Sequence, residues 1–522
     1  MSLRMKCIKI FTFFQENKKA SLRKAAAETG ISKSSVDRHK KAVERRNQHP
    51  ESLMWETEPG QKWLVLLVCA TLYIFGIRCG IGMETISEFF KRIRLEKHLG
   101  VSPSSLQRLV AELEKAIMEY RETYEKNEKG TARAVVGADE TFFDKMILVM
   151  IELSSGYILL EEPSEDRTYE TWKEKALSVL KALGLKVVYM VSDNAKALAK
   201  LALDGIGCSR IPDLFHAVNE IVRVMGARFA NKVARVQRKL SEAAVALKLL
   251  KELGKNPEKI RAKEQLVEKL KSEHEIVLKG QSRYHEELHN FSKAVHPFST
   301  DDGTPRTSED VERVLLLILC TLKALAEEYE IKDNKKGLDK AEKQIREIAV
   351  LIDLWWMWVK ESIAHFNLSA EKKDWLLYCF LPVIYWQIQL RRTSSEPFRY
   401  AYETAYEEAL ALLNSHPLTS GISEEETKQW HSWAHWTVMK FQRTSSAVEG
   451  RNGTLSRMNH NQRSVPLTRL KALTVIHNFG IKRQDGTTAA ERLFGEKFPD
   501  LFEWIVERMG DLPLPRDRLI TG

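Results

Sequence analysis

Three acidic residues occupy positions from which they could bind divalent metal ions together. Asp139 closes one apolar run expected to form a strand, Asp193 closes a second, and Glu449 lies on a late helix. If the two strands lie side by side and parallel, both aspartates emerge at the same end of the sheet. Mg²⁺ and Mn²⁺ prefer such carboxylate oxygens, and two ions can clamp the attacking and leaving oxygens of a displacement at phosphorus. The pattern predicts metal-dependent phosphoryl transfer, with a plain helix cap or loop acid as the alternative for each aspartate alone.

The elements that must position these acids alternate between strand and helix. The order strand, strand, strand, helix, strand, helix, strand is predicted for 134–139, 145–153, 157–162, 169–183, 186–192, 195–203 and 208–211. This is the order of a ribonuclease-H-like sheet. The 54 positions from Asp139 to Asp193 suit that arrangement. The 256 positions from Asp193 to Glu449 exceed its needs, so an all-helical insertion is expected over 226–440.

Helical patterns fill this long interval. Two long helices, 232–253 and 258–278, are predicted to form a hairpin joined by Gly254-Lys-Asn-Pro257. Further helices are expected near 307–330, 335–365, 370–392 and 398–413, and basic helices at 447–458 and 467–478. The cluster Trp355-Trp356-Met357-Trp358 is interpreted as core or as a packing surface under a partner.

Charge is concentrated at two places in the chain. The 522 residues carry a net charge of +10, yet residues 1–50 hold 13 Lys/Arg against 4 Asp/Glu, and residues 440–485 hold 9 against 2. Two basic segments around a mildly acidic middle favour a polyanionic partner such as nucleic acid over evenly solvated helix faces.

Composition excludes several classes of protein. At 43% hydrophobic and 29% charged residues the chain is neither disordered nor fibrous. The six cysteines are scattered without zinc spacing, which argues against a zinc site or a disulfide framework. No signal peptide is recognisable, and the apolar run Trp63–Ile77, about 15 residues, is shorter than the roughly 20 that a bilayer requires. We therefore expect a cytoplasmic protein with no membrane partner and read this run as a buried helix.

Residues 20–46 have the pattern of a helix-turn-helix. Gly30 supplies the turn, Ser32 can cap the second helix, and Val36 and Val43 face inward. A plain helical hairpin is the alternative. The side chains expected to face outward and contact DNA are Lys33, Ser34, Arg38 and Lys41. The stretch Gly100–Leu106 repeats the spacing, as either a second helix-turn-helix or a connector bundle.

Three sequence blocks resemble the catalytic blocks of the DDE transposases of bacterial insertion sequences. They are Gly137-Ala-Asp139-Glu-Thr-Phe142, Val191-Ser-Asp193-Asn-Ala-Lys196 and Ser445-Ser-Ala-Val-Glu449-Gly-Arg-Asn452. Phe441–Gly453, Asn459–Arg463 and Leu473–Phe479 are also similar to one such bacterial group. The resemblance covers about 134–225 and 430–505 well and the intervening helices more loosely.

The resemblance implies a ribonuclease-H-like fold and metal-dependent cleavage and joining of DNA ends. Asp139, Asp193 and Glu449 map onto the ligands of two Mg²⁺ or Mn²⁺ ions. The implied partners are double-stranded DNA, both the terminal inverted repeats of the element and its target, and further copies of the chain in a synaptic complex. The implied location is the nucleoid in the bacterial cytoplasm.

Further residues are candidates for supporting roles. Arg451, Asn452, Arg457 and Arg463 could contact DNA phosphates, and Asn452 could instead hold a carboxylate. Lys196 and His216 could support the site. Glu140 is expected to point to the opposite face from Asp139 and is left out of the metal site.

The predicted fold class is a multidomain α + α/β protein. It comprises a helix-turn-helix at 1–50, a helical linker or second DNA-binding bundle at 51–130, a ribonuclease-H-like mixed sheet core at 131–225 and 441–522, and the all-helical insertion at 226–440. The alternative functions are a domesticated or inactive relative that acts as a DNA-binding regulator, and a ribonuclease-H-like structure-specific nuclease without joining activity.

Overall fold

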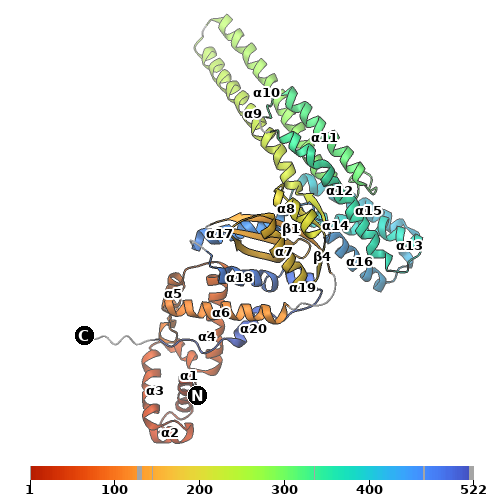
Figure 1. Cartoon of the computed structure of the whole chain (residues 1–522). Helices are drawn as coiled ribbons and strands as arrows, with labels where there is room; N and C mark the ends of the chain where they lie inside the picture. The colour runs from red at the N-terminus through yellow and green to blue at the C-terminus, as the bar shows by residue number, and fades with distance from the viewer. Residues whose placement is uncertain are drawn as a thin grey trace.

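The chain folds into an elongated molecule with one sheet near its middle (Figure 1). The computed structural model describes residues 2–125, 132–143, 145–254, 256–333, 336–462 and 465–515. N-terminal helices lie at one end and a long helical hairpin extends from the other. The described part is mostly helical with one small mixed sheet, which confirms the α + α/β fold class in this coarse form.

The sheet has five strands in the order β3-β2-β1-β4-β5. Strands β1, β4 and β5 are parallel to one another, and β2 is antiparallel to both β1 and β3. The strand bounds are Ala132–Phe142, Met146–Glu152, Tyr157–Ser164, Leu185–Ser192 and Ser209–Pro212 for β1 to β5. The predicted order of strands and helices is therefore observed, with α7 (Tyr169–Ala182) and α8 (Lys196–Lys200) between the strands.

Strand β1 is longer than predicted. Asp139 does not close it, because Glu140 to Phe142 continue to pair with β2 as far as Phe142 opposite Met146. The parallel pairing with β4 ends earlier, at Gly137 opposite Val191. Asp139 therefore lies in the part of β1 that pairs with β2 but no longer pairs with β4.

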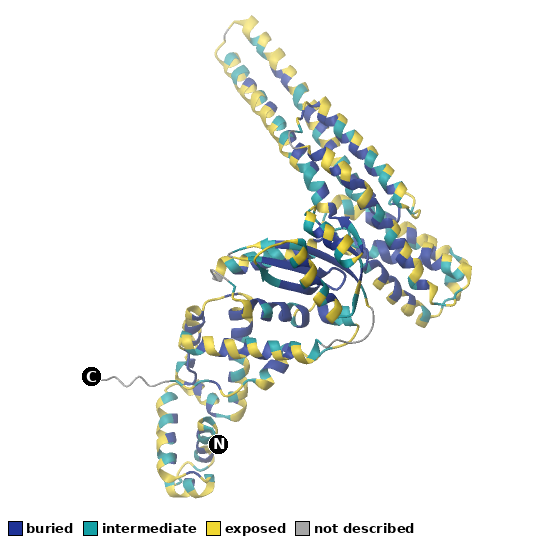
Figure 2. Cartoon of the chain, viewed as in Figure 1, coloured by how far each residue is buried: buried dark blue, intermediate teal, exposed yellow. Residues whose placement is uncertain are grey.

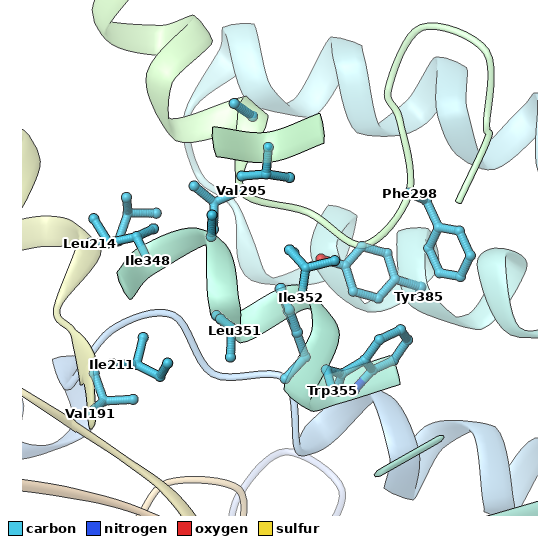
Figure 3. Packing of buried hydrophobic residues seen from close by; sticks show 14 of the residues in the cluster. Val191, Ile211, Leu214, Val295, Phe298, Ile348, Leu351, Ile352, Trp355 and Tyr385 are labelled. Carbon is cyan, nitrogen blue, oxygen red and sulfur yellow. The ribbon is translucent and has the colours of Figure 1, made fainter. Parts of the chain in front are cut away.

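The two faces of the sheet pack against different parts of the chain. On one face Val135 and Val191 join a core that continues into the helical insertion. Figure 3 shows Val191 and Ile211 beside Leu214, with Leu351 of α12 (Gly337–Ala364) next to them. On the other face, alternate residues of β1 join helices from both ends of the chain: Ala134, Val136 and Ala138. The insertion is therefore anchored to the sheet by a shared core.

The helical insertion begins inside the first long helix. α9 runs unbroken over Leu214–Glu252 and pairs with α10 (Pro257–Ala294), so the expected boundary at 225/226 falls within α9. Both helices are longer than predicted. The helices that follow, besides α12, are α11 (Ser308–Glu328), α13 (Ala370–Trp375), α14 (Leu381–Arg392), α15 (Glu396–Ser415) and α16 (Glu424–Met439). Figure 2 shows that the far end of the hairpin is exposed, whereas the helices near the sheet are largely buried.

The tryptophan cluster of α12 belongs to the core. Trp355, Trp356 and Trp358 are all buried, and only Met357 is exposed. The indole N–H of Trp355 donates to the carbonyl oxygen of Thr437 at 3.1 Å. The interpretation of this cluster as core is confirmed.

The N-terminal region contains three helices. The expected pair is present as α2 (Leu22–Thr29) and α3 (Lys33–Arg46), with Gly30 at a left-handed φ of 69° between them. Ser32 makes no side-chain capping bond, contrary to expectation. An unpredicted helix, α1 (Leu3–Glu16), completes this small core.

A helical bundle connects this region to the sheet. It is formed by α4 (Glu58–Thr71), α5 (Met83–Arg92), α6 (Pro103–Tyr124), α18 (Leu467–Val475) and α20 (Leu501–Arg508), and α19 (Ala489–Phe494) packs nearby. Shorter 3₁₀ or π turns occupy Pro50–Glu56, Leu72–Arg78, Leu95–Lys97, Leu201–Ile206, Leu376–Phe380, Pro417–Gly421 and Ile476–Gly480.

The apolar helix and the second candidate turn of this bundle differ from what the sequence predicts. Within the described residues, one continuous helical stretch, Glu58–Arg78, is long and apolar enough to cross a membrane, and half of its apolar window is buried inside the protein. The second candidate helix-turn-helix lacks its turn, because Gly100 does not adopt positive φ. Its amide instead donates to the carbonyl oxygen of Pro513 at 2.8 Å. The exposed face of α6 carries positive and negative side chains in alternation, namely Arg108, Glu112, Lys115 and Glu119.

Candidate active site

Gly137 brings a late helix against the first strand. A Cβ at residue 137 would lie 3.0 Å from Cγ2 of Val448 and 2.8 Å from Cδ2 of Leu153, so a larger residue would push these side chains away from the strand. Val448 is fully buried and directly precedes Glu449 on α17 (Ser446–Gln462). This close approach brings Glu449 to the same face of β1 as Asp139.

Asn452 connects the same helix to Asp139. It lies three residues after Glu449, on the same face of α17, and its Nδ2 donates to Oδ2 of Asp139 at 2.9 Å. Asn452 was predicted either to contact phosphate or to hold a carboxylate, and this bond shows that it holds the carboxylate of Asp139. Its Oδ1 is buried without a partner among the described residues.

Asp193 lies directly after β4, level with Asp139. The last residues paired between β1 and β4 are Gly137 and Val191. Asp139 and Asp193 each lie two residues further along the chain. Oδ1 of Asp193 accepts a hydrogen bond from the amide of Ala195 at 2.9 Å, which fixes the carboxylate at the strand end. The two aspartates therefore come from neighbouring parallel strands, as expected.

His216 extends the cluster on the side of Glu449. Its Nε2 lies 3.5 Å from Oε1 of Glu449. Ligand atoms of Asp213, His216 and Glu449 all lie within 4.8 Å of one another. His216 was predicted as a possible supporting residue, and the structure brings it to the acids.

Asp213 was not predicted, and it positions the cluster. Its Oδ1 accepts from the amides of Phe215 and His216, which caps α9, and its Oδ2 accepts from the amide and hydroxyl of Ser445 at 2.6 and 2.5 Å. Four accepted bonds use all of the lone pairs of a carboxylate. Asp213 therefore locks the start of α9 to the start of α17 and is not free to bind a cation. The available signal was an Asp directly before a helix.

The acids repel one another electrostatically. The pKa of Asp139 is raised to about 6, chiefly by burial, and the charges of Asp193 and Glu140 contribute to this rise. Burial and then Asp213 raise the pKa of Glu449, while His216 opposes the shift. Among the described residues no Lys or Arg forms an ion pair with Asp139, Asp193 or Glu449. Clustered carboxylate oxygens without a compensating cation fit a divalent metal ion.

One predicted DNA contact is not available on α17. Arg451 is buried, and its Nε and Nη2 donate to the two oxygens of Glu161 on β3, each at 2.6 Å. The predicted phosphate contact of Arg451 is wrong for this reason, whereas that of Asn452 stays a prediction. Arg457 is exposed and contacts only Thr454 on its own helix. Arg463 lies outside the described residues.

The other candidates lie as follows. Lys196 is exposed at the start of α8, and the structure gives it no bond to the three acids. Glu140 faces away from Asp139, since its Oε1 accepts from the indole N–H of Trp172 at 3.1 Å. The predicted outward residues of α3, namely Lys33, Ser34, Arg38 and Lys41, are all exposed. Lys41 forms an ion pair at 2.9 Å with Asp37.

Comparison with known proteins matches one part of the chain. Residues 376–520 match DUF6399, a family of unknown function. The matched segment contains Glu449 and Asn452, whereas Asp139 and Asp193 lie before it. No curated protein matches the chain.

Proposed function

We propose that the chain is a DDE-type transposase with a ribonuclease-H-like core. It binds the ends of its mobile element and carries out metal-dependent cleavage and strand transfer of DNA. The observation that carries this proposal is the placement of the three acids: Asp139 lies on β1, Asp193 lies at the end of the neighbouring parallel strand β4, and Glu449 lies on α17, whose Asn452 bonds to Asp139. None of the three forms an ion pair with Lys or Arg among the described residues. The strand order β3-β2-β1-β4-β5 with an antiparallel β2 supports the same fold.

The chain's own residues have distinct roles in this proposal. Asp139, Asp193 and Glu449 would hold Mg²⁺ or Mn²⁺, which when bound activates the attacking oxygen and neutralises charge on the phosphate. Asn452 orients the carboxylate of Asp139. His216 lies beside Glu449 and can hold or release a proton there. Asp213 keeps both helices in register with the sheet.

The surroundings of the site suit a polyanionic substrate. A cavity of about 280 Å³ begins at Phe215, next to His216, and is lined by Arg392 and Arg443. Burial lowers the pKa of Arg392, and the charges of Arg483 and Arg443 lower it further. Arg443 donates to the carbonyl oxygens of Ser292 and Val295 at 3.0 Å. Arginines that repel one another beside a phosphoryl-transfer site favour DNA phosphate as their partner.

The decisive experiment measures cleavage of a plasmid that carries the DNA flanking the gene. We expect Asp139→Asn, Asp193→Asn and Glu449→Gln each to lower cleavage by the full-length chain in Mg²⁺ at least ~10³-fold, about 4 kcal/mol of activation free energy. Glu140→Gln is the matched control, since it neutralises the next residue of β1 on the opposite face, and it should cleave like wild type. Excess EDTA should abolish cleavage.

Three results would count against the proposal. Full cleavage by any of the three variants removes that residue from the site, and cleavage in EDTA removes the metal mechanism. Joining of a pre-cut end to a second DNA tests the class: a structure-specific nuclease would cleave but not join. A DNA-binding regulator would do neither while still binding the flanking DNA.

The N-terminal helices are proposed to read DNA sequence. α3 exposes Arg38 and Lys41, and an Arg that forks to guanine contributes roughly 1–3 kcal/mol of discrimination. Arg38→Ala should reduce the preference for flanking over scrambled DNA, whereas Lys41→Ala should weaken binding to both about equally. A salt titration of binding to both duplexes checks this. An unchanged preference after Arg38→Ala would show that Arg38 does not read bases.

A further inference from the structure

A cavity of about 350 Å³ separates the N-terminal helices from the connecting bundle. Its volume is at the lower end of the roughly 300–1,000 Å³ that small-molecule sites occupy. One wall comes from α1 and α3, and the other from the 3₁₀ turn Pro50–Glu56, α4, Lys97-His98 and Leu514. The cavity is remote from the acidic cluster, which lies beyond the bundle on the sheet.

Three residues that line this cavity each carry a buried nitrogen with no hydrogen-bond partner among the described residues. These nitrogens are Nε of Arg4 on α1, Nε2 of His39 on α3, and Nε2 of His98 on the opposite wall. His39 is 7% exposed and His98 is 4% exposed. The second ring nitrogen of each histidine faces the protein: Nδ1 of His39 lies 3.4 Å from Sγ of Cys7, and Nδ1 of His98 lies 3.8 Å from Oε1 of Glu56. Leaving such groups unpaired costs free energy, so their natural partner is something that fills the cavity.

The charge of the cavity favours an anion. Its lining contains one carboxylate, Glu56, which is already paired with Arg46 and bonded by Asn47 at 2.8 Å. The other cations that line it are Arg4, Arg38 and Lys97. Among the described residues, Arg4 donates to neutral oxygens, namely the side-chain amide of Gln61 and the carbonyls of His98 and Leu512. Burial lowers the pKa of Arg4, and the nearby charges of Asp511 and Glu56 oppose this shift without bonding to it. A half-buried guanidinium that is bonded to neutral oxygens is a binding group for an acidic ligand.

The remaining lining is apolar. It comes from Leu3, Ile8, Ala42 and Leu514. We infer that the cavity binds a small organic anion, with its acidic group on Arg4, His39 and His98 and its apolar body against these side chains. A ligand in this position bridges α3 and the segment 95–98, so it fixes the N-terminal helices against the bundle.

The test uses probes of matched shape. Benzoate and phenyl phosphate share an apolar ring and differ in the acid, and benzyl alcohol is the uncharged control. Calorimetric titration of the full chain should show one site for at least one of the anions and at least about tenfold weaker binding of benzyl alcohol. The better anion also distinguishes a carboxylate from a phosphate ligand.

Two variants locate the binding site. Ala42→Phe fills the cavity without removing any bond, and His98→Leu removes a polar group while keeping the wall apolar. Each should weaken anion binding at least about tenfold. Ala111→Phe on the exposed face of α6 is the matched control and should bind like wild type. In wild type the bound anion should slow amide hydrogen exchange in 33–46 and 95–99 and leave 226–294 unchanged.

The inference is overturned if no anion binds, which is the result expected when water alone fills the cavity. It is also overturned if binding persists in Ala42→Phe, or if exchange slows elsewhere only. None of these measurements uses DNA or cleavage, so they are independent of the proposed function.

Discussion

Two sets of acids on or next to the same sheet differ in burial and in whether a basic side chain is paired with them. Glu152 and Glu161, on β2 and β3, are almost fully buried, and each has its own cation. Nζ of Lys440 lies 2.9 Å from Glu152, and Arg451 makes two bonds at 2.6 Å with Glu161. Asp139 and Asp193 have no such partner among the described residues. Position in a sheet therefore does not separate these two sets of acids, whereas the presence of a basic partner does, and the proposed function assigns the uncompensated set to the active site.

The pKa values of Glu152 and Asp139 are shifted in opposite directions. Burial alone would raise the pKa of Glu152, but Lys440 and Ser155 together hold it below the ordinary value. Burial also raises the pKa of Asp139, and there the neighbouring acids add to the rise. The charged form of Glu152 therefore stabilises the folded chain, whereas the charged form of Asp139 destabilises it.

Breaking a compensated pair should give the largest effect. Arg451→Leu leaves Glu161 buried and unpaired, and loss of one partner of a buried pair typically costs about 3–5 kcal/mol. Urea unfolding followed by tryptophan fluorescence measures the change in free energy of unfolding. Arg457→Leu, exposed on the same helix, is the control and should change it by less than about 0.5 kcal/mol. Equal effects of the two substitutions would contradict a structural role for the pair.

Supplying the missing cation should give the next largest effect. Mn²⁺ at ten times its dissociation constant should stabilise the wild-type chain by about 1.4 kcal/mol, because it binds only the folded state. The gain should disappear in Asp139→Asn and persist in Glu140→Gln. Calorimetric unfolding with and without the ion checks both. Stabilisation of Asp139→Asn as large as that of wild type would place the ion elsewhere.

The sequence was sufficient for features that depend on local pattern. The strand order, the turn at Gly30 and the acid directly after β4 all follow from neighbouring residues. Partners that are distant in the chain were not predictable in this way. Arg451 looked like a surface residue because its partner Glu161 lies 290 positions earlier. Asp213 was not predicted, and its partner Ser445 lies 232 positions later.

The end of β1 was also mispredicted because it depends on a pairing partner elsewhere in the chain. Asp139 was predicted to close the strand, since polar residues follow it. Pairing of Glu140 to Phe142 with β2 extends the strand, and no local signal records that pairing. The candidate site was nevertheless predictable, because its position depends on the parallel pairing of β1 with β4, which ends before Asp139.

The smallest predicted effect concerns the pH dependence of stability without metal. The pKa of Asp139 is about 6 in the folded chain and near its ordinary value of about 3.8 when unfolded. Its stabilising contribution is complete below the unfolded value and is lost as pH rises through 6. Asp139→Asn does not titrate, so in EDTA its stability relative to wild type should rise between about pH 4 and pH 6. The gain should reach about 1 kcal/mol, reduced by solvent screening because Asp139 is only partly buried.

Glu152→Gln provides the comparison with the opposite sign. The pKa of Glu152 is lowered in the folded chain, so its contribution is present above the unfolded value and is lost as pH falls. The variant should therefore be less stable than wild type at pH 7, and the difference should shrink towards pH 4. Urea titrations of both variants and wild type across this range measure the two slopes. If Asp139→Asn is less stable than wild type at pH 7, the charge of Asp139 is compensated within the protein, and the distinction between the two sets of acids fails.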